Sequence, residues 1–275
     1  MEGKLYLVAT PIGNLEDITL RAIKILKEVD IIAAEDTRHT LKLLNHLEIK
    51  KTLISYHRHN EDIKTSNLIE KLLEGKNIAL VTDAGTPAIS DPGEEIVKKA
   101  IENNIKIVPI PGACALINAL IVSGFSTKQF SFYGFLPMNK KLRKKAFENI
   151  LKENKTIIIY EAPHKMKTTL GDLKEILKDR KIVLARELTK IHEEFIRKSI
   201  DELLSEIDTI KGEMILIIEG NKIDTEECKN FDEISLEDHY KLYEEKGLNK
   251  KEIIKQIAKD RNVNKNEIYM YFLEK

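Results

Sequence analysis

The sequence predicts an α/β fold with two α/β domains and a small C-terminal helical module. Through residues 4–122, short apolar or β-branched runs alternate with helical patterns, which is typical of a mainly parallel sheet. A second series of apolar runs begins after Gly124, and two helix-start signals follow one another towards the C-terminal end. The expected segments are an N-terminal α/β domain at residues 1–124, a second α/β domain at 125–220, a linker at 221–234 and the helical module at 235–275.

The expected strands of the first domain are apolar and β-branched runs bounded by turn signals. They lie at residues 5–9, 30–34, 52–55, 78–81 and 105–109. Thr19 can cap a helix at residues 20–28, and leucines and isoleucines at helical spacing predict another helix at residues 67–73. Small residues at 111–115 open a further helix directly after the last of these strands.

The second domain offers further strands with helices between them. Strands are expected at residues 130–135, 156–160, 182–185 and 214–218, and helices around residues 142–152, 164–178 and 200–207. Residues 221–234 are polar and acidic without periodicity, which indicates a linker.

The C-terminal segment contains two capping boxes, in which an Asn and a Glu three residues later cap the same helix start. They pair Asn249 with Glu252 and Asn264 with Glu267, and each precedes apolar residues at helical spacing. With a third helix at residues 235–243, the pattern resembles a helix-turn-helix module. Basic residues outnumber acidic ones eight to four between residues 246 and 275, which suits contact with RNA phosphates. A helical cap or a support for a dimer is the other interpretation.

Composition and charge exclude several classes of protein. The 275 residues are 42% hydrophobic, and 45 basic residues balance 45 acidic ones, which excludes a globally basic nucleic-acid binder. No apolar run approaches the roughly 18–20 residues that cross a bilayer, and the N-terminus lacks a basic region followed by an apolar segment. We therefore expect a cytoplasmic protein with no membrane partner. Cys114 and Cys228 lie far apart in different kinds of segment, which predicts neither a disulfide framework nor a zinc site.

Residues 82–93 combine small residues, two prolines and carboxylates directly after the buried strand at 78–81. In an open α/β sheet, ligands bind outside the carboxyl ends of the strands, and small residues let a ligand approach the backbone. A capped connection without a ligand is the alternative. Asp91 is expected to be the N-cap of the next helix, with Pro92 at its first position and Glu94 completing a capping box.

Two other loops concentrate polar side chains at strand ends. Residues 35–39 gather two carboxylates, a guanidinium and an imidazole after the second strand, and a capped helix start with surface ion pairs is the alternative to a functional loop. Residues 57–59 read His-Arg-His after the third strand. No acidic or cysteine partner is spaced around them, so contact with nucleic acid is favoured over a metal site, with a solvated loop as the alternative.

Motifs for several common chemistries are missing from the sequence. It contains no GxGxxG dinucleotide fingerprint, no Walker GxxxxGK[ST] loop, no HExxH zinc motif and no GxSxG elbow. These absences argue against phosphate-cleaving enzymes and against serine hydrolases.

Six other motifs stand in an order that resembles the ribosomal RNA methyltransferases of the tetrapyrrole methylase superfamily. They occupy residues 7–15, 35–38, 82–93, 109–112, 161–164 and 185–190. The resemblance runs from about residue 4 to residue 220, and the helical tail is also similar to that family's C-terminal extension. The first loop lacks the Gly-Pro-Gly-Asp pattern, and the third loop lacks the Gly-Gly-Asp-Pro pattern, of the members that modify tetrapyrroles. These departures argue against a tetrapyrrole substrate.

The resemblance implies two α/β domains of tetrapyrrole-methylase type with a cleft for S-adenosylmethionine between them. It further implies 2′-O-methylation of a cytidine in the decoding region of small-subunit (16S) rRNA, with free rRNA or the 30S subunit as partner, and a homodimer. No metal is implied. Carried over position by position, the cofactor contacts are expected at Pro11, Ala84, Gly85, Thr86, Ile89, Cys114, Ala115, Tyr160, Glu161, Ala162 and Leu188.

Methyl transfer to a ribose hydroxyl needs alignment with the sulfonium methyl and help for a nucleophile that is poor at neutral pH. The leaving thioether is neutral and needs no acid. Candidate bases are Glu35, Asp36, Asp83, Glu161, His164 and Glu187. We expect the catalytic groups in two polar loops at strand ends, at Glu35, Asp36, Arg38, Glu161 and His164, with a positioning or structural hydrogen bond as the alternative for each.

RNA binding by a chain of zero net charge requires a local basic patch. Five basic residues in six positions follow the aromatic strand at 130–135, where a solvated helix start is the other interpretation. The expected RNA contacts are Lys140, Lys141, Arg143, Lys144 and Lys145, with His57 and Arg58 from the loop after the third strand. Two other functions stay open: methylation of a tetrapyrrole or a protein residue, and a non-catalytic RNA-binding factor on the same fold, which a test of S-adenosylmethionine binding distinguishes.

Overall fold

The computed structural model describes residues 2–177, 179–221, 234–245, 247–261 and 263–273. The chain divides into two compact units, residues 1–221 and 222–275. The expected linker at 221–234 lies outside the described residues except at its two ends, and Cys228 lies outside them as well. Among the helices described, none combines the length and the apolar character needed to span a bilayer.

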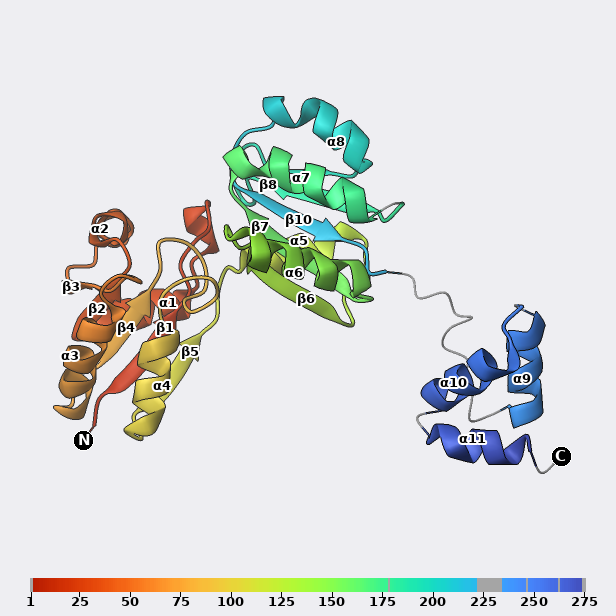
Figure 1. Ribbon diagram of the computed structural model, residues 1–275. Coiled ribbons are helices and arrows are strands. Elements are labelled where there is room, and N and C mark those ends of the chain that lie inside the picture. The colour runs from red at the N-terminus through yellow and green to blue at the C-terminus, as the bar shows by residue number, and fades with distance from the viewer. Residues whose placement is uncertain (1, 178, 222–233, 246, 262, 274–275) are drawn as a thin grey trace. The chain divides into compact units, whose positions relative to one another are not determined.

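A parallel sheet forms the centre of the N-terminal half of the first unit (Figure 1). Its strands, in spatial order, are β3 (Thr52–Ser55), β2 (Ile31–Ala34), β4 (Ile78–Val81), β1 (Lys4–Val8) and β5 (Lys106–Ile110), which confirms the predicted mainly parallel sheet. β4 lies in the middle, and all of its residues are buried because helices cover both faces of the sheet. The accompanying helices are α1 (Leu20–Glu28), α2 (Thr37–His46), α3 (Glu61–Leu73) and α4 (Glu94–Glu102), and a 3₁₀ turn, η1 (Leu15–Asp17), follows β1.

Apolar clusters fill the two faces of this sheet. Leu80 belongs to the cluster that packs under α3 and α4, and its neighbour Val81 belongs to the cluster under α1 and α2. The alternation follows from the pleat, which turns successive side chains to opposite faces. α3 begins at Glu61 rather than at residue 67, and its first turn carries Glu61 and Asp62, where acidic side chains interact favourably with the helix N-terminus.

A mixed sheet forms the second half of the same unit. Its strands, in spatial order, are β6 (Phe130–Phe135), β7 (Thr156–Glu161), β10 (Met214–Ile218), β8 (Ile182–Arg186) and β9 (Glu194–Ile196). Only β6 and β7 pair in parallel, while β10 runs antiparallel to both of its neighbours. The helices are α6 (Lys140–Lys152), α7 (Pro163–Leu177) and α8 (Ile200–Glu206), followed by a 3₁₀ turn, η2 (Ile207–Thr209). The edge strand β9 is not predicted from the sequence, because it has three residues of which one is buried.

Helix α5 (Ala115–Ser123) packs on the second sheet although it follows β5 of the first. Leu116, Ala119 and Leu120 lie in one buried cluster with Ile158 of β7 and Ile217 of β10. The domain boundary after residue 124 stays a prediction, but α5 contributes its buried face to the core of the second sheet. This helix therefore couples the two halves of the unit.

The predicted cap of α4 is wrong. The helix begins at Glu94, its N-cap is Gly93 with φ +141°, and no side chain caps it. Only glycine adopts such a φ with little strain. The helix therefore starts after Gly93, and Asp91 is not its N-cap. Asp91 is thereby left outside the helix start.

In the described part of the second unit, three helices surround a small apolar cluster. They are α9 (Leu236–Glu245), α10 (Lys250–Asp260) and α11 (Lys265–Tyr271), and Ile253, Ile257 and Ile268 are buried among them. The capping box of Asn249 and Glu252 is confirmed in both directions. At α11 the Asn264 side chain accepts a hydrogen bond from the Asn266 N–H, so Asn264 caps the helix but the expected box with Glu267 is not formed.

His239 is the buried polar centre of this unit. Arg261 Nε donates a hydrogen bond to His239 Nδ1 at 3.1 Å, and the Asp260 carboxylate lies 3.3 Å from His239 Nε2. Burial first, and then the nearby Arg261 guanidinium, lower the pKa of His239 below its ordinary value of 6.5. The imidazole therefore stays neutral in the folded unit at neutral pH.

The helical unit should lose stability as the pH falls below 6.5. The unfolded chain then binds a proton at His239 that the folded unit does not, so unfolding becomes more favourable down to the lowered pKa. Hydrogen exchange of α9–α11 in the full chain, corrected for the intrinsic pH dependence, should show weaker protection at pH 5.5 than at pH 7.5. The variant His239→Asn keeps an acceptor for Arg261 but cannot titrate, and equal pH dependence in both proteins would contradict this account.

Candidate functional site

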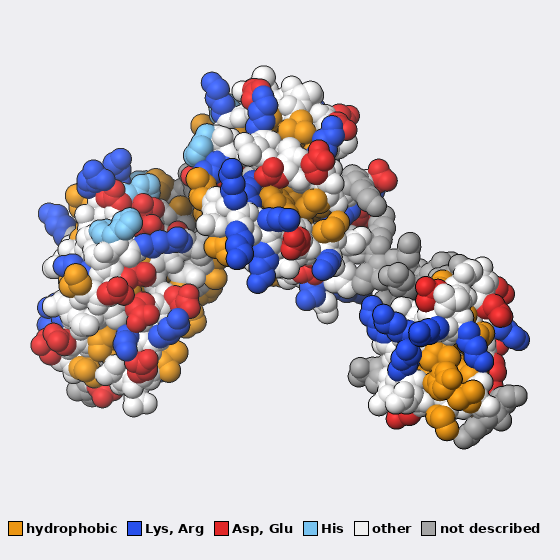
Figure 2. Space-filling model, viewed as in Figure 1, with side chains coloured by type: hydrophobic (Ala, Val, Ile, Leu, Met, Phe, Trp, Pro, Cys, Tyr) orange, Lys and Arg blue, Asp and Glu red, His pale blue; other side chains and the backbone are white. Residues whose placement is uncertain are grey.

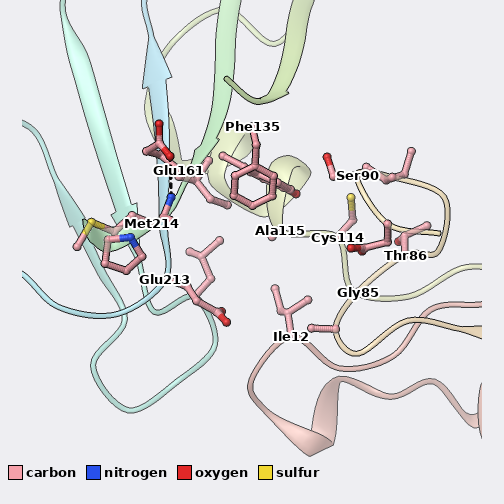
Figure 3. A pocket seen from close by; sticks show the side chains of 18 residues that line it. Ile12, Gly85, Thr86, Ser90, Cys114, Ala115, Phe135, Glu161, Glu213 and Met214 are labelled. Carbon is pink, nitrogen blue, oxygen red and sulfur yellow. Dashed lines mark hydrogen bonds between the residues drawn. The ribbon is translucent and has the colours of Figure 1, made fainter. Parts of the chain in front are cut away.

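A pocket of about 390 Å³ lies between the carboxyl ends of the first sheet's strands and the second sheet. Loops after β1, β4 and β5 supply one wall, and the ends of β6, β7 and β8 with the start of β10 supply the other (Figure 3). Its volume falls within the range of roughly 300–1,000 Å³ that is common for small-molecule sites, and its lining is mostly apolar.

Hydrogen bonds join the three loops of the first wall. The backbones of Thr10 and Gly85 exchange two hydrogen bonds of 2.9 and 3.0 Å, and Thr86 Oγ1 donates to the Ala113 carbonyl oxygen at 3.0 Å. Gly85 has φ +86°, which glycine adopts without strain. A Cβ on Gly112 would lie 2.9 Å from the Ala9 side chain, so the loops after β1 and β5 touch at the backbone. The wall is a fixed surface built of small residues.

Tyr160 at the end of β7 links the second wall to α5. Its hydroxyl oxygen accepts a hydrogen bond from the Leu116 N–H at 3.0 Å, which satisfies a donor in the first turn of α5. Burial raises the pKa of the Tyr160 hydroxyl, so it stays neutral. The rings of Phe132 and Phe135 pack edge-on against Tyr160 at centroid distances of 4.9 and 5.8 Å. A register shift beside Gly134, which has φ +59°, bends β6 there and sets Phe135 at the pocket.

A contact between two loops lies beside the pocket residues Ile12 and Leu188. The Asn14 N–H donates to Thr189 Oγ1 at 3.1 Å, and a Cβ on Gly13 would lie 2.5 Å from the Lys190 side chain. Glu187 supports this loop because its carboxylate accepts hydrogen bonds from the Glu213 N–H and from Lys190 Nζ. These two bonds hold the pKa of Glu187 below its ordinary value. The loop after β8 is thus fixed by charge-assisted hydrogen bonds.

The structure brings together all of the expected cofactor residues except Pro11. Pro11 is buried next to the pocket, and its neighbour Ile12 lines the pocket instead. The remaining positions, which all line the pocket, are Ala84, Gly85, Thr86, Ile89, Cys114, Ala115, Tyr160, Glu161, Ala162 and Leu188. Their contact with a cofactor stays a prediction.

The loop of Glu35, Asp36 and Arg38 does not line this pocket. Asp36 caps α2 through the Arg38 N–H and forms a two-point ion pair with the Arg38 guanidinium, at 3.0 and 2.6 Å. The Arg38 side chain holds the pKa of Asp36 well below its ordinary value, which makes that carboxylate a weak base. Glu35 accepts a hydrogen bond of 2.7 Å from Thr82 Oγ1 and faces the loop after β4. The catalytic role of this loop stays a prediction.

Glu161 and His164 separate in the structure. The Glu161 carboxylate is buried and accepts hydrogen bonds from Thr169 Oγ1 at 2.6 Å and from the Ala162 N–H at 2.9 Å. The Thr169 hydroxyl in turn accepts one from Arg143. His164 is exposed at the first turn of α7 and does not line the pocket. Glu161 therefore has a structural hydrogen-bond network at the pocket wall, which argues against its action as a free base.

A second, more open groove of about 720 Å³ runs between α6 and α7. The predicted RNA contacts Lys140, Arg143 and Lys144 line it together with His164 and Lys165, while Lys141 and Lys145 are exposed beside it. Figure 2 shows Lys and Arg side chains gathered on this part of the surface. Arg143 is partly neutralised by Asp172, which it contacts at 2.9 Å. Exposed lysines and an exposed methionine, Met138, leave the groove open to a charged, partly apolar partner.

The other predicted RNA contacts lie in the loop after β3. The Arg58 guanidinium donates to the Ser90 carbonyl oxygen, and the His57 backbone N–H donates to Asn60 Oδ1 at 2.8 Å. Arg58 thereby holds the loop after β4, a structural contact that the sequence pattern does not indicate. RNA contact by these residues stays a prediction.

Sequence reasoning missed several pocket residues. They are Ile12, Ser90, Asp91, Phe135, Pro163, Glu213, Met214 and Ile215. Most are neighbours of predicted positions or belong to strands whose ends could not be placed against the first sheet. Asp91 was assigned to the helix cap, although it lies within the same motif as the predicted residues. Burial, followed by the nearby Glu35 carboxylate, raises the pKa of Asp91 to about 6.

Comparison with known proteins shows the family to which the chain belongs. Residues 4–204 match the family described as Tetrapyrrole (Corrin/Porphyrin) Methylases. The chain is 52% identical over 272 residues to the ribosomal RNA small subunit methyltransferase I of Halalkalibacterium halodurans, covering 98% of this chain and 94% of that protein. The protein of the same name from Bacillus subtilis is also 52% identical over 272 residues, covering 97% and 93%.

A solved structure shares the fold at low sequence identity. The uroporphyrin-III C-methyltransferase of Thermus thermophilus, solved in complex with S-adenosylhomocysteine, superposes with a TM-score of 0.58 at 15% identity. The match covers 79% of this chain and 97% of that one.

Tyr160→Phe should lower the free energy of unfolding by about 1–2 kcal/mol, because the buried Leu116 N–H loses its acceptor. Urea denaturation of the full chain measures the change. Tyr133→Phe is the matched control, since the Tyr133 hydroxyl makes no hydrogen bond within the described residues. Equal stability of the two variants would contradict the role given to the Tyr160 hydroxyl.

Proposed function

Because the chain belongs to the tetrapyrrole methylase family and, within it, to the ribosomal RNA small subunit methyltransferases I, we propose that it methylates the 2′-hydroxyl of a cytidine in the decoding region of 16S rRNA. The methyl donor in this proposal is S-adenosylmethionine. The observation that carries the proposal is the pocket between the two sheets, whose lining contains all but one of the positions expected to contact that cofactor.

The residues of the pocket fit such a cofactor. Ala84, Gly85, Cys114 and Ala115 present small side chains and accessible backbone, and Gly85 stands in a conformation that other residues rarely adopt. Leu188 and Ile215 supply apolar surface on the opposite side. These residues would hold the cofactor. When bound, it supplies a methyl group attached to a sulfonium sulfur, and the leaving group is a neutral thioether.

The walls of the pocket would contribute alignment of the reacting groups. The first wall is fixed by the bridge between Thr10 and Gly85, and the second by the contact between Tyr160 and Leu116, so the two reacting groups would meet between rigid surfaces. Phe135 is 57% exposed at the pocket, where it offers a ring for a base to stack on. Orientation by such surfaces can supply most of the rate enhancement in a displacement that needs no acid.

The groove between α6 and α7 supports the choice of RNA as substrate. Pro163 lines the pocket and the next residue, His164, lines the groove, so the two hollows are lined by neighbouring residues at the start of α7. A strand of rRNA with its phosphates against Lys140 and Lys144 would be held close to the pocket. The 30S subunit or free rRNA as partner, and a homodimer whose contact uses the exposed apolar face of α5 at Ile117 and Ile121, belong to the same proposal.

The reaction is tested with labelled S-adenosylmethionine and undermethylated small subunits, with free 16S rRNA in parallel. We expect label in rRNA, located by mapping at the 2′-oxygen of one cytidine in the decoding region.

Ala84→Phe places a ring in the pocket from an exposed position, so it should weaken cofactor binding at least about tenfold, by calorimetry, without changing the unfolding temperature. Label in a base or in protein, or no cofactor binding by the wild type, would contradict the proposal.

Replacement of Lys140, Lys141, Lys144 and Lys145 by Ala should weaken rRNA binding and flatten its salt dependence. Each lysine that meets a phosphate contributes about 0.7–0.9 to the slope of log K against log salt concentration. The control replaces Lys24, Lys27, Lys42 and Lys50, which are exposed on or near α1 and α2 and change the net charge equally. If both variants lose the same slope, the α6 groove is not the RNA site.

A further inference from the structure

Asp91 stands at the pocket without the structural task that its sequence suggests. It lines the pocket, yet it does not cap α4, which begins beyond it at Glu94 with Gly93 as N-cap. The side chain is half-buried, in a loop where residues on both sides are fully buried or strained. A carboxylate held in this way has no part in starting the helix and faces the space where a ligand would lie.

The loop that carries Asp91 is held in an unusual backbone conformation. Ala88 and Ser90 both have φ +65°, a region that costs energy for residues with a Cβ. Arg58 donates to the Ser90 carbonyl oxygen, and the Ser90 hydroxyl oxygen would lie only 3.2 Å from a Cβ on Gly134 of β6. The surrounding structure therefore fixes the position of Asp91 between the two sheets.

The charged groups around Asp91 favour a proton on it. Burial disfavours the charged form of Asp91. The Glu35 carboxylate, which accepts a hydrogen bond from Thr82 Oγ1 at 2.7 Å, is the negative neighbour with the largest effect on Asp91. Asp83 adds a second negative neighbour, and Arg58 opposes both.

The other carboxylates at the pocket are occupied by fixed partners. Glu161 accepts hydrogen bonds from Thr169 and Ala162 in a buried network. The Glu213 side chain is 76% exposed and pairs with Lys190 at 3.1 Å. Asp91, which also lines the pocket, is instead made easier to protonate by burial and by the neighbouring carboxylates.

We propose that Asp91 is the base that accepts the proton of the attacking hydroxyl during methyl transfer, an assignment that rests on the proposed function. The hydroxyl oxygen forms a bond to the methyl carbon as the bond from carbon to sulfur breaks, and that electron pair stays on sulfur. The hydroxyl proton passes to an Asp91 carboxylate oxygen and leaves to water after product release. The hydroxyl substrate and the sulfonium donor thus give the methyl ether, the neutral thioether and one proton.

A pH dependence follows from the groups that face Asp91. Burial and the carboxylates of Glu35 and Asp83 raise its pKa to about 6, against the opposing effects of Thr82 and Arg58. Asp91 is then protonated and inactive as a base below pH 6 and ionised above it, so the rate of transfer rises with pH through about 6. Tyr160, which also faces Asp91, stays neutral over this range because its pKa is raised.

The first test observes Asp91 without any turnover. Carbon-detected NMR of the ligand-free full chain, labelled at aspartate carboxyls, should show one signal that titrates near pH 6 and is missing from Asp91→Asn. Glu35→Gln should shift that signal to lower pH because a negative neighbour is removed. A titration of Asp91 at the ordinary value of 3.8 would overturn the proposal.

The second test measures single-turnover methyl transfer to undermethylated small subunits. At saturating S-adenosylmethionine, Asp91→Asn should slow transfer by about 100-fold or more and abolish the rise near pH 6. Asp91→Glu should keep a pH-dependent rise. If the wild type is active and Asp91→Asn transfers methyl groups at the same rate and with the same pH profile, the base assignment alone is overturned. If the wild type shows no transfer, the proposed function is overturned and the assignment with it.

Discussion

The structure depends on contacts that join the loops of one sheet to the strand ends of the other. Two hydrogen bonds show how this is done: Asn14 N–H to Thr189 Oγ1, and Leu116 N–H to the Tyr160 hydroxyl. Each joins a loop or helix that follows a strand of the first sheet to the end of a strand in the second sheet. With α5 buried against β7 and β10, these contacts set the width of the pocket, and small residues such as Ala84 and Ala115 leave it open.

Carboxylates of the same kind acquire different properties because their partners differ. Asp36 has a guanidinium at hydrogen-bond distance and stays charged, Glu187 is held ionised by a backbone N–H and Lys190, and Asp91 is half-buried beside other carboxylates. A carboxylate that already has a strong partner gains little by taking a proton. This contrast, rather than position at a strand end, separates a capping or structural role from a candidate base.

Much of the fold could be predicted from the sequence, because its signals are local. Buried runs such as residues 78–81 and 214–218 form the expected strands, and Asn249 caps the expected helix. The packing of α5 on the second sheet could not be predicted, since its residues are apolar on nearly every side and so indicate no partner. The edge strand β9 was missed because three residues give no measurable periodicity.

The site, like the fold, could be predicted where its signals are local and not where they depend on packing between the sheets. The small residues at strand ends were identified because they belong to a recognisable motif, and they do line one pocket. Asp91 was misassigned because Asp-Pro-Gly-Glu resembles a helix start, whereas the left-handed turn at Gly93 that displaces the cap depends on the fold around Leu80 and Ala88. Phe135 and Glu213 gave no sequence signal, since only the approach of the second sheet brings them to the pocket.

We propose that one pocket between the two sheets holds the methyl donor. A crystal structure of the full chain with S-adenosylhomocysteine tests it most directly. We expect the ligand in contact with the backbone of Gly85 and Ala115 on one side and with Leu188 and Ile215 on the other, and with its sulfur on the side that Asp91 faces. A ligand bound in the groove of α6 and α7, or on one sheet alone, would contradict it.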